Sequence, residues 1–326
     1  MTAKSQAGFD SIHLAASAGP RAQTTPAMWV EELLADARVE RGIERNGELG
    51  IEIKDAGEFA LISARLPEAI SLGGAALERR VAEMYAAIAA KIEKLAIAKH
   101  PVRLWNHIPD IHRKMDDRRD RYMVFNAGRY RAFSSWYGGS AAFDKEVATA
   151  SGIGHDGKDL IVHCLCARQA GMPVSNPRQI PPHRYSARYG PLPPCFARAT
   201  VLSPAKMILV GGTASIRGED SLHAASLPLQ LLETFTNLAS VVEAASVKAA
   251  PAKCNGKRPG AQQHQEEWLA RFRDVRVYYP RAADREALET MVRGAFDSGC
   301  RIEMRRADLC RAELLVEIEG VAGLTH

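Results

Sequence analysis

The stretch RQAGMPVSNPRQIPPHRYSARYGPLPP, residues 168–194, decides how this chain of 326 residues is divided. It holds seven of the 17 prolines, and a proline fixes its own backbone and disfavours helix in the residue before it. We therefore predict an ordered but irregular linker here, with a folded domain on each side of it. The length of the chain is sufficient for two domains of ordinary size.

The residues before the linker combine short apolar runs with one long amphipathic segment. Residues 50–53 and 59–66 are bounded by Gly and Asp and predict a strand pair. Over residues 75–98 apolar side chains recur three or four positions apart, which predicts a helix. Further strands are predicted at 102–105, 122–126 and 159–166. Residues 1–27 lack periodicity, so we expect a flexible leader before a first domain that covers residues 28–167.

The residues after the linker repeat this order and predict a second domain over residues 195–326. Predicted strands at 197–202 and 207–211 precede a helix at 223–245, and strands at 275–279, 301–305 and 314–319 flank a helix at 284–296. Residues 246–265 are predicted to form a flexible surface loop. VRLW at 102–105 and VRVY at 275–278 occupy comparable places, which favours a diverged duplication. Both halves predict an α/β (α+β) domain, a mixed sheet packed by helices.

Composition excludes several classes of protein. With 46% hydrophobic and 25% charged residues, the chain is globular rather than disordered or fibrous. Lys and Arg exceed Asp and Glu by 43 − 38 = +5. This small excess of positive charge is spread along the chain, so we expect no nucleic-acid partner. It suits an enzyme whose substrate carries carboxylates. No segment reads as a signal peptide or a membrane span, so we expect a cytoplasmic protein without a membrane partner. The six cysteines are expected to be reduced.

Two segments carry candidate binding groups. HRYSARYGPLPPCFARAT, residues 183–200, sets arginines beside Tyr185 and Tyr189, a combination that suits a carboxylated ring, although prolines also stack on tyrosines to stiffen a linker. Arg198 lies in a predicted strand of small apolar residues, where an inward-facing Arg needs an anion. In GGTAS, residues 211–215, we expect the glycines to allow a positive φ at a strand exit and Thr213 to face a pocket.

The VEIE segment, residues 316–319, carries two carboxylates on one predicted strand. Glu317 and Glu319 are two positions apart and therefore share a face. A solvent-facing strand surface is one interpretation of the pair. The surrounding residues are apolar, however, and a carboxyl in such a setting has a raised pKa and can serve as a general acid. The histidines and cysteines follow no HExxH or CxxC pattern, so no metal site is predicted.

Several separate motifs, in the same order along the chain, together resemble the chorismatase family, which cleaves chorismate to pyruvate and a cyclohexadiene diol or a hydroxybenzoate. The motifs are RYRAFSSWYGG, ARQAGMPVSNPRQ, RYSARYGPLPPCFARAT, LVGGTASIRGEDSLH and DLCRAELLVEIEG, and they span roughly residues 120–320. The second half is also similar to one unit of the RidA/YjgF-like fold. The resemblance implies two domains with a fold like that of RidA and the AroH class of chorismate mutase.

The resemblance also implies roles for particular residues and no cofactor or metal. Glu317 is the implied catalytic acid, which protonates the enolpyruvyl methylene of chorismate. Cys310 marks family members that make a hydroxybenzoate, here 3-hydroxybenzoate, 4-hydroxybenzoate or both. The residues implied to hold the substrate or influence its placement are Arg198, Arg301, Tyr185, Tyr189, Thr213 and Ala214.

Two other functions remain open at the level of sequence. The RidA-like half alone indicates an enamine/imine deaminase, and a non-catalytic metabolite-binding protein would also use arginines to hold a carboxylate. A duplicated chain is compatible with a monomer or with a pseudo-trimeric assembly.

Overall fold

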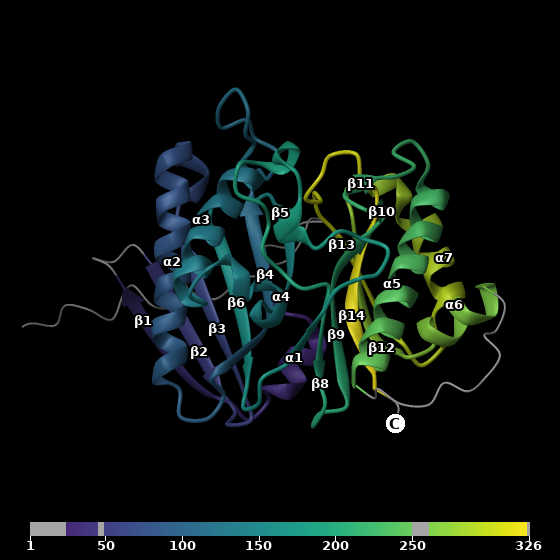
Figure 1. Ribbon diagram of the computed structural model, residues 1–326, viewed down its shortest axis with the longest axis horizontal. Helices are drawn as coiled ribbons and strands as arrows, with labels where there is room; N and C mark the ends of the chain where they lie inside the picture. The colour runs from purple at the N-terminus through teal and green to yellow at the C-terminus, as the bar shows by residue number, and fades with distance from the viewer. Residues whose placement is uncertain (1–23, 45–48, 250–260, 325–326) are drawn as a thin grey trace, which may run out of the picture.

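The chain forms two six-stranded sheets that face each other, with helices on their outer sides (Figure 1). The computed structural model describes residues 24–44, 49–249 and 261–324. The two mixed sheets packed by helices confirm the predicted fold class. Most of the predicted leader and the middle of the predicted 246–265 loop lie outside the described residues.

The first sheet takes its strands from residues 38–167 in the order β1, β2, β3, β6, β4 and β5. Their bounds are β1 Arg38–Glu44, β2 Leu49–Asp55, β3 Phe59–Leu66, β4 His100–Pro109, β5 Thr149–His155 and β6 Leu160–Ala167. All neighbours are antiparallel except β4 and β5. The helices α2 (Gly74–Lys94) and α3 (Arg121–Trp136) cover the outer face (Figure 1), because one side of α2 is an apolar stripe that packs into the core.

The second sheet takes its strands from residues 172–323 in the order β7, β8, β9, β14, β12 and β13. Their bounds are β7 Met172–Val174, β8 Ala199–Leu202, β9 Met207–Ala214, β12 Phe272–Tyr279, β13 Arg301–Arg306 and β14 Glu317–Gly323. A small hairpin of β10 (Ile216–Arg217) and β11 (Asp220–Ser221) follows β9. The helices α5 (Leu227–Ala249), α6 (Ala261–Leu269) and α7 (Arg285–Ala295) lie on the outer side (Figure 1).

The two halves share one topology. In each sheet the strands, counted along the chain without the small hairpin, lie in the order first, second, third, sixth, fourth and fifth. The fourth and fifth strands are the parallel pair in both. VRLW lies in β4 and VRVY in β12, which are the two fourth strands. The topology therefore supports the predicted duplication.

Several predicted elements differ from the observed ones. The helix predicted at 223–245 begins at Leu227 and continues to Ala249, so the loop predicted from 246 starts later. The strand predicted at 314–319 is β14, which starts at Glu317. The linker begins with β7, which pairs with β8 and so belongs to the second sheet.

The predicted strand at 122–126 is wrong, because these residues begin α3. Asp120 caps the helix by accepting a hydrogen bond from the backbone N–H of Met123 at 2.8 Å. Gly128 lets α3 approach α2 closely, since a Cβ there would lie 2.4 Å from the carbonyl oxygen of Glu78. Burial of the Val124, Phe125 and Phe133 side chains then fixes the helix on the sheet.

A short segment of residues 24–34 bridges both sheets where they meet. Arg276 donates hydrogen bonds to the carbonyl oxygens of Thr25 and Pro26 at 3.0 and 2.8 Å. Trp29, in α1 (Met28–Leu33), contacts Trp105 with ring centroids 5.9 Å apart. Residues 24–27 of the predicted leader, residues 1–27, are therefore packed against the fold rather than flexible. Among the described helices none has both the length and the apolar character of a membrane span.

Candidate active site

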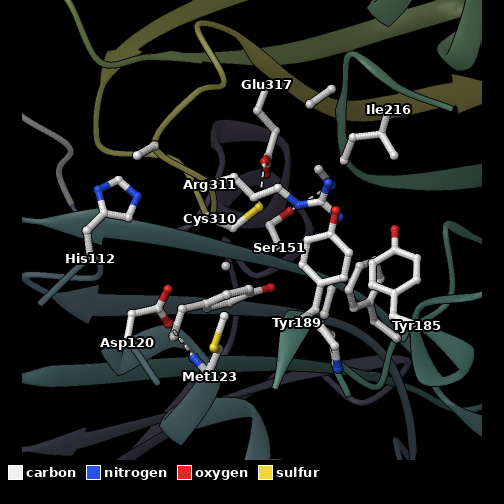
Figure 2. Close-up of a pocket in the computed structure, with 18 of the residues that line it drawn as sticks. His112, Asp120, Met123, Ser151, Tyr185, Tyr189, Ile216, Cys310, Arg311 and Glu317 are labelled. Atoms are coloured by element: carbon white, nitrogen blue, oxygen red, sulfur yellow. Dashed lines mark hydrogen bonds between the residues drawn. The ribbon is translucent and has the colours of Figure 1, made fainter. Parts of the chain in front are cut away.

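A cavity of about 330 Å³ lies between the two halves of the chain. It is lined by α3 and β5 of the first half, by the linker, and by β9 and the loop before β14 of the second half. Its volume is that of a small-molecule site. Figure 2 shows the Glu317 carboxyl directed at Cys310, with Tyr185 and Tyr189 to one side.

Glu317 is the first residue of β14, and its side chain lies on the cavity wall with only 4% of its surface exposed. Its carboxyl reaches this position because position 212 is glycine. A Cβ at Gly212 would lie 1.9 Å from Oε1 of Glu317. The pair of glycines in GGTAS therefore allows close approach, and neither has the positive φ that we expected.

The environment of Glu317 favours its protonated form. Burial raises the pKa of the carboxyl to about 8, and the nearby charge of Glu319 acts in the same direction, against the lowering effect of Arg103 and Arg198. Within the described residues, the one hydrogen-bond donor to this carboxyl is Cys310, whose Sγ lies 3.9 Å from Oε2. A buried carboxyl that is protonated near neutral pH, and that few neighbouring groups hydrogen-bond, can act as a general acid.

Cys310 remains a thiol under the same conditions. Burial raises its pKa to about 12, and the Glu317 charge adds to the shift. The thiolate is the reactive form of cysteine, so Cys310 is suited to filling space and donating a weak hydrogen bond rather than to nucleophilic attack.

Two buried guanidinium groups on the cavity wall lack an acidic partner. Arg129 of α3 is 1% exposed and Arg198, which precedes β8, is 4% exposed. Arg129 donates to Oδ1 of Asn126 at 2.8 Å, and Arg198 donates to the hydroxyl of Tyr185. Among the described residues no carboxylate pairs with either one, and the Nε of each has no hydrogen-bond partner. A buried, unpaired cation is costly, so both groups are suited to hold anionic ligand groups.

Aromatic side chains of the linker form another wall of the cavity. The rings of Tyr185 and Tyr189 have centroids 5.1 Å apart. The guanidinium of Arg311 lies 4.0 Å from the Tyr189 ring centroid, a cation–π contact. Arg311 also donates to the carbonyl oxygen of Glu219 at 2.8 Å, which joins the loop before β14 to the small hairpin.

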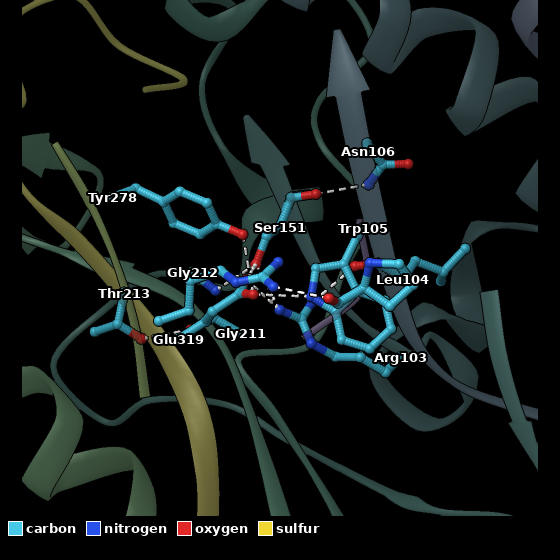
Figure 3. A network of polar contacts seen from close by, with 12 residues as sticks. Arg103, Leu104, Trp105, Asn106, Ser151, Gly211, Gly212, Thr213, Tyr278 and Glu319 are labelled. Atoms are coloured by element: carbon cyan, nitrogen blue, oxygen red, sulfur yellow. Dashed lines mark hydrogen bonds and ion pairs between the residues drawn. The ribbon is translucent and has the colours of Figure 1, made fainter. Parts of the chain in front are cut away.

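Glu319 lies on the same face of β14 as Glu317, as their spacing predicts. It is 3% exposed, so the solvent-facing interpretation of the pair is wrong. Figure 3 shows its carboxylate surrounded by donors from both halves, among them Arg103 at 2.6 Å and Ser151 at 2.5 Å.

The structure places six of the eight residues predicted for the site on the cavity wall. These are Glu317, Cys310, Arg198, Tyr185, Tyr189 and Ala214. Thr213 does not line the cavity, because it alternates with Gly212 and Ala214 along β9 and so points to the other face of the sheet. Its hydroxyl donates to the carbonyl oxygen of Gly211 at 2.9 Å (Figure 3).

Arg301 is also misplaced by the prediction. It lies on the edge strand β13, which β12 separates from β14. Its guanidinium pairs with Glu32 and, at 2.8 Å, with Asp274. Both acids lie outside the cavity wall, so Arg301 fastens α1 to the second sheet instead of facing a ligand.

Sequence reasoning missed the cavity residues of the first half. Tyr122 and Arg129 come from α3, which was predicted in part as a strand, and Ser151 comes from β5. The helical spacing of Tyr122, Phe125 and Arg129 was the available signal. Among the described residues, no three His, Cys, Asp or Glu side chains are grouped as metal ligands would be.

The chain is similar to a group of related proteins over most of its length. Residues 36–166 match the profile described as chorismatase FkbO/Hyg5-like, N-terminal. The 3-hydroxybenzoate synthase of Streptomyces hygroscopicus is 32% identical over 310 residues, which cover 93% of this chain and 82% of that protein. A chorismatase of the same organism is 30% identical over 222 residues, 67% of this chain and 60% of the relative. A chorismatase crystal structure aligns with a TM-score of 0.71 and 24% identity, covering 87% of this chain and 79% of that one.

Proposed function

Because the chain belongs to the chorismatase family, we propose that it is an enzyme that converts chorismate to pyruvate and a hydroxybenzoate in the cavity between its two halves. The observation that carries the proposal is the buried Glu317 carboxyl, whose pKa of about 8 leaves it protonated at neutral pH on the wall of a cavity of suitable size.

The proposed chemistry begins with proton transfer from Glu317. Chorismate carries an enol ether, and a proton added to its terminal methylene carbon gives an oxocarbenium ion. A carboxylic acid held in its protonated form supplies that proton without metal or nucleotide. As the bond between the ring carbon and the ether oxygen breaks and pyruvate leaves, the oxygen of the neighbouring ring hydroxyl bonds to that carbon and loses its proton, which gives an arene oxide. The arene oxide then reopens at the carbon that first carried the hydroxyl, its oxygen takes up a proton, and the carbon that keeps the oxygen loses one. The product is 3-hydroxybenzoate, and the proton released overall restores the Glu317 carboxyl.

Arg129 and Arg198 are proposed to hold the two carboxylates of chorismate. The substrate carries one carboxylate on the ring and one on the side chain, and the cavity offers two buried guanidinium groups without an acidic partner among the described residues. Each carboxylate would satisfy the Nε–H donor that is otherwise unused. Tyr185 and Tyr189 are proposed to pack against the ring.

The product is proposed to be 3-hydroxybenzoate. Hydroxybenzoate and pyruvate together contain all the atoms of chorismate, whereas the diene diol requires one added water. Cys310 occupies space beside the acid where a water would otherwise fit, which favours the reaction without water. The relative named 3-hydroxybenzoate synthase, at 32% identity, supports the 3-isomer over the 4-isomer.

The test is to incubate the purified protein with chorismate, without metal or nucleotide. Pyruvate is measured by a coupled assay, and hydroxybenzoates and diene diols are separated by chromatography. We expect pyruvate and 3-hydroxybenzoate in equal amounts. Chorismate bound tightly but not consumed would instead indicate a metabolite-binding protein, and ammonia released from an amino-acid-derived enamine would indicate a deaminase.

A further inference from the structure

A second carboxylate, Glu319, lies two residues beyond the acid and is held by four donors. Arg103 donates to Oε2 at 2.6 Å and Ser151 at 2.5 Å, while Trp105 and Tyr278 donate to Oε1 at 2.9 and 3.1 Å (Figure 3). Arg103 and Glu319 are both almost fully buried, with side chains 2% and 3% exposed. Such a set of donors, one of them a guanidinium, stabilises the ionised carboxylate.

The ion pair is joined to the cavity floor through Ser151. The hydroxyl oxygen of Ser151 accepts from Arg103 at 2.6 Å and from the backbone N–H of Gly212 at 2.9 Å, and its proton goes to Glu319. Gly212 is the residue against which the Glu317 carboxyl lies. Hydrogen bonds through Ser151 therefore connect the Arg103–Glu319 pair to Gly212 in β9, next to Glu317.

The repeated topology indicates that the fold does not require this pair. Arg276 in β12 holds the position of Arg103 in β4, since each is the Arg of its VR segment. Across the sheet Arg276 lies opposite Glu319, whereas Arg103 lies opposite Leu165. Tyr278 likewise lies opposite Glu317, whereas Trp105 lies opposite His163. The first half thus forms the same sheet with neither carboxylate.

Burying an ion pair contributes little or no net stability compared with apolar residues. Arg276 keeps its partner within its own half, where it pairs with Glu303 of β13. Arg103 instead crosses from the first half to Glu319 in the second. A buried pair that crosses between the halves beside the acid, and that the equivalent half lacks, has a use beyond folding.

We propose that Glu319, fixed by Arg103 and Ser151, is a positioning residue that holds Glu317 in its protonated form. The inference rests on the proposed function, in which Glu317 donates a proton. A fixed negative charge beside a carboxyl disfavours a second negative charge there, and Glu319 is fixed on the same face of the same strand. Arg103 and Ser151 hold Glu319 in place through their hydrogen bonds to Oε2.

Other charged and titratable groups also surround Glu317 and contribute to its ionisation. Those from the strands, the helix and the loop packed around it are Glu319 (β14), Arg103 (β4), Tyr278 (β12), Tyr122 and Arg129 (α3), Arg198 (before β8), and Cys310 and Arg311 (loop before β14). The two arginines that act on Glu317 most directly, Arg103 and Arg198, favour its ionised form. Glu319 is the nearby group that opposes them by charge.

The test compares pH profiles of kcat/KM for variants that change one charge each. Glu319→Gln should move the basic limb down by roughly one pH unit or more, with activity recovered at lower pH, because Arg103 then acts on Glu317 without opposition. Arg103→Gln should move the limb up, because it removes a positive charge that favours ionised Glu317, while Ser151, Trp105 and Tyr278 still hold Glu319. Glu233→Gln is the matched control, a Glu to Gln change that also breaks an arginine pair, with Arg178, but lies on α5 outside the cavity, and it should leave the limb in place.

Infrared titration of the carboxylic C=O band that Glu317→Gln removes supplies a readout independent of turnover. This band should titrate at lower pH in Glu319→Gln than in the wild type. An unchanged limb and band in folded Glu319→Gln would overturn the inference, as would equal shifts in Glu233→Gln. If Glu319→Gln does not fold, the Arg103→Gln variant decides instead. A basic limb of its pH profile that stays in place or moves to lower pH would also overturn the inference. A wild-type protein that releases no pyruvate contradicts the proposed function. In that case the infrared titration of the Glu317 band, compared between the wild type and Glu319→Gln, still tests the inference.

Discussion

The Sγ of Cys310 lies 3.9 Å from Oε2 of Glu317, at the wall of the cavity between the two halves. Among the described residues the thiol is the one donor to this carboxyl, and its side chain occupies space beside it. In the proposed reaction this contact connects the protonation of Glu317 with the space available to water beside the acid.

Replacing Cys310 with Ala is therefore expected to change the product ratio. The smaller side chain leaves room for a water beside Glu317, and the diene diol is the product that needs a water. The diol, or a second hydroxybenzoate isomer, should rise at the expense of 3-hydroxybenzoate while total pyruvate changes less. Chromatography of the products measures the ratio. An unaltered ratio would mean that Cys310 only fills space.

Glu317→Gln should remove the acid and leave the fold intact. Gln has nearly the same shape, and the change removes a carboxyl rather than a paired charge. We expect kcat to fall by about 10²- to 10⁴-fold, the usual contribution of general acid catalysis. The measurement is the rate of pyruvate release, with circular dichroism as the check on folding. A variant that retains wild-type turnover would exclude Glu317 as the proton donor.

The activity should decline on the alkaline side of neutrality. Burial raises the pKa of Glu317 from 4.5 to about 8, and the acid must be protonated to react. The protonated fraction is close to one at pH 6 and one half near pH 8, so kcat/KM should be level below that pH and lose about tenfold per unit above it. A profile that instead declines above pH 5 would indicate an acid with an ordinary carboxyl pKa.

The sequence predicts the parts of the fold that depend on local composition. The prolines of residues 168–194 mark the linker, and the repeated order of apolar runs predicts two mixed sheets. Glu317 and Glu319 were correctly assigned to one face of a strand, because side-chain direction alternates with a period of two. The same rule, applied to Thr213, would have placed it away from Ala214.

Contacts between distant segments explain what the sequence did not predict. Residues 122–126, YMVFN, are apolar and aromatic enough to indicate a strand over a short window, and the Asp120 cap and packing against α2 decide for a helix. Arg129 was missed as a consequence. Arg301 was misassigned because its partners, Glu32 and Asp274, are distant in sequence, and local pattern does not tell which acid an arginine meets.

Variants of Arg129, Arg198 and Arg301 distinguish a role in substrate binding from a role in stability. Arg129→Gln and Arg198→Gln should each raise KM by about 10- to 100-fold, since a hydrogen bond to a charged group contributes about 1.5–3 kcal/mol. Neither change breaks an ion pair among the described residues, so stability should change little. Arg301→Gln is the matched control, because it loses its pairs with Glu32 and Asp274 but does not line the cavity.

We expect Arg301→Gln to keep the wild-type KM and to lower the melting temperature, since its pair with the exposed Glu32 is screened by solvent but its pair with the buried Asp274 is not. Steady-state kinetics with chorismate and thermal unfolding measure the two effects. A raised KM in Arg301→Gln with normal values in the other two variants would move the carboxylate site from the cavity to the edge of the second sheet. The opposite pattern, a raised KM at Arg129 and Arg198 alone, means that the two unpaired guanidinium groups hold the two carboxylates.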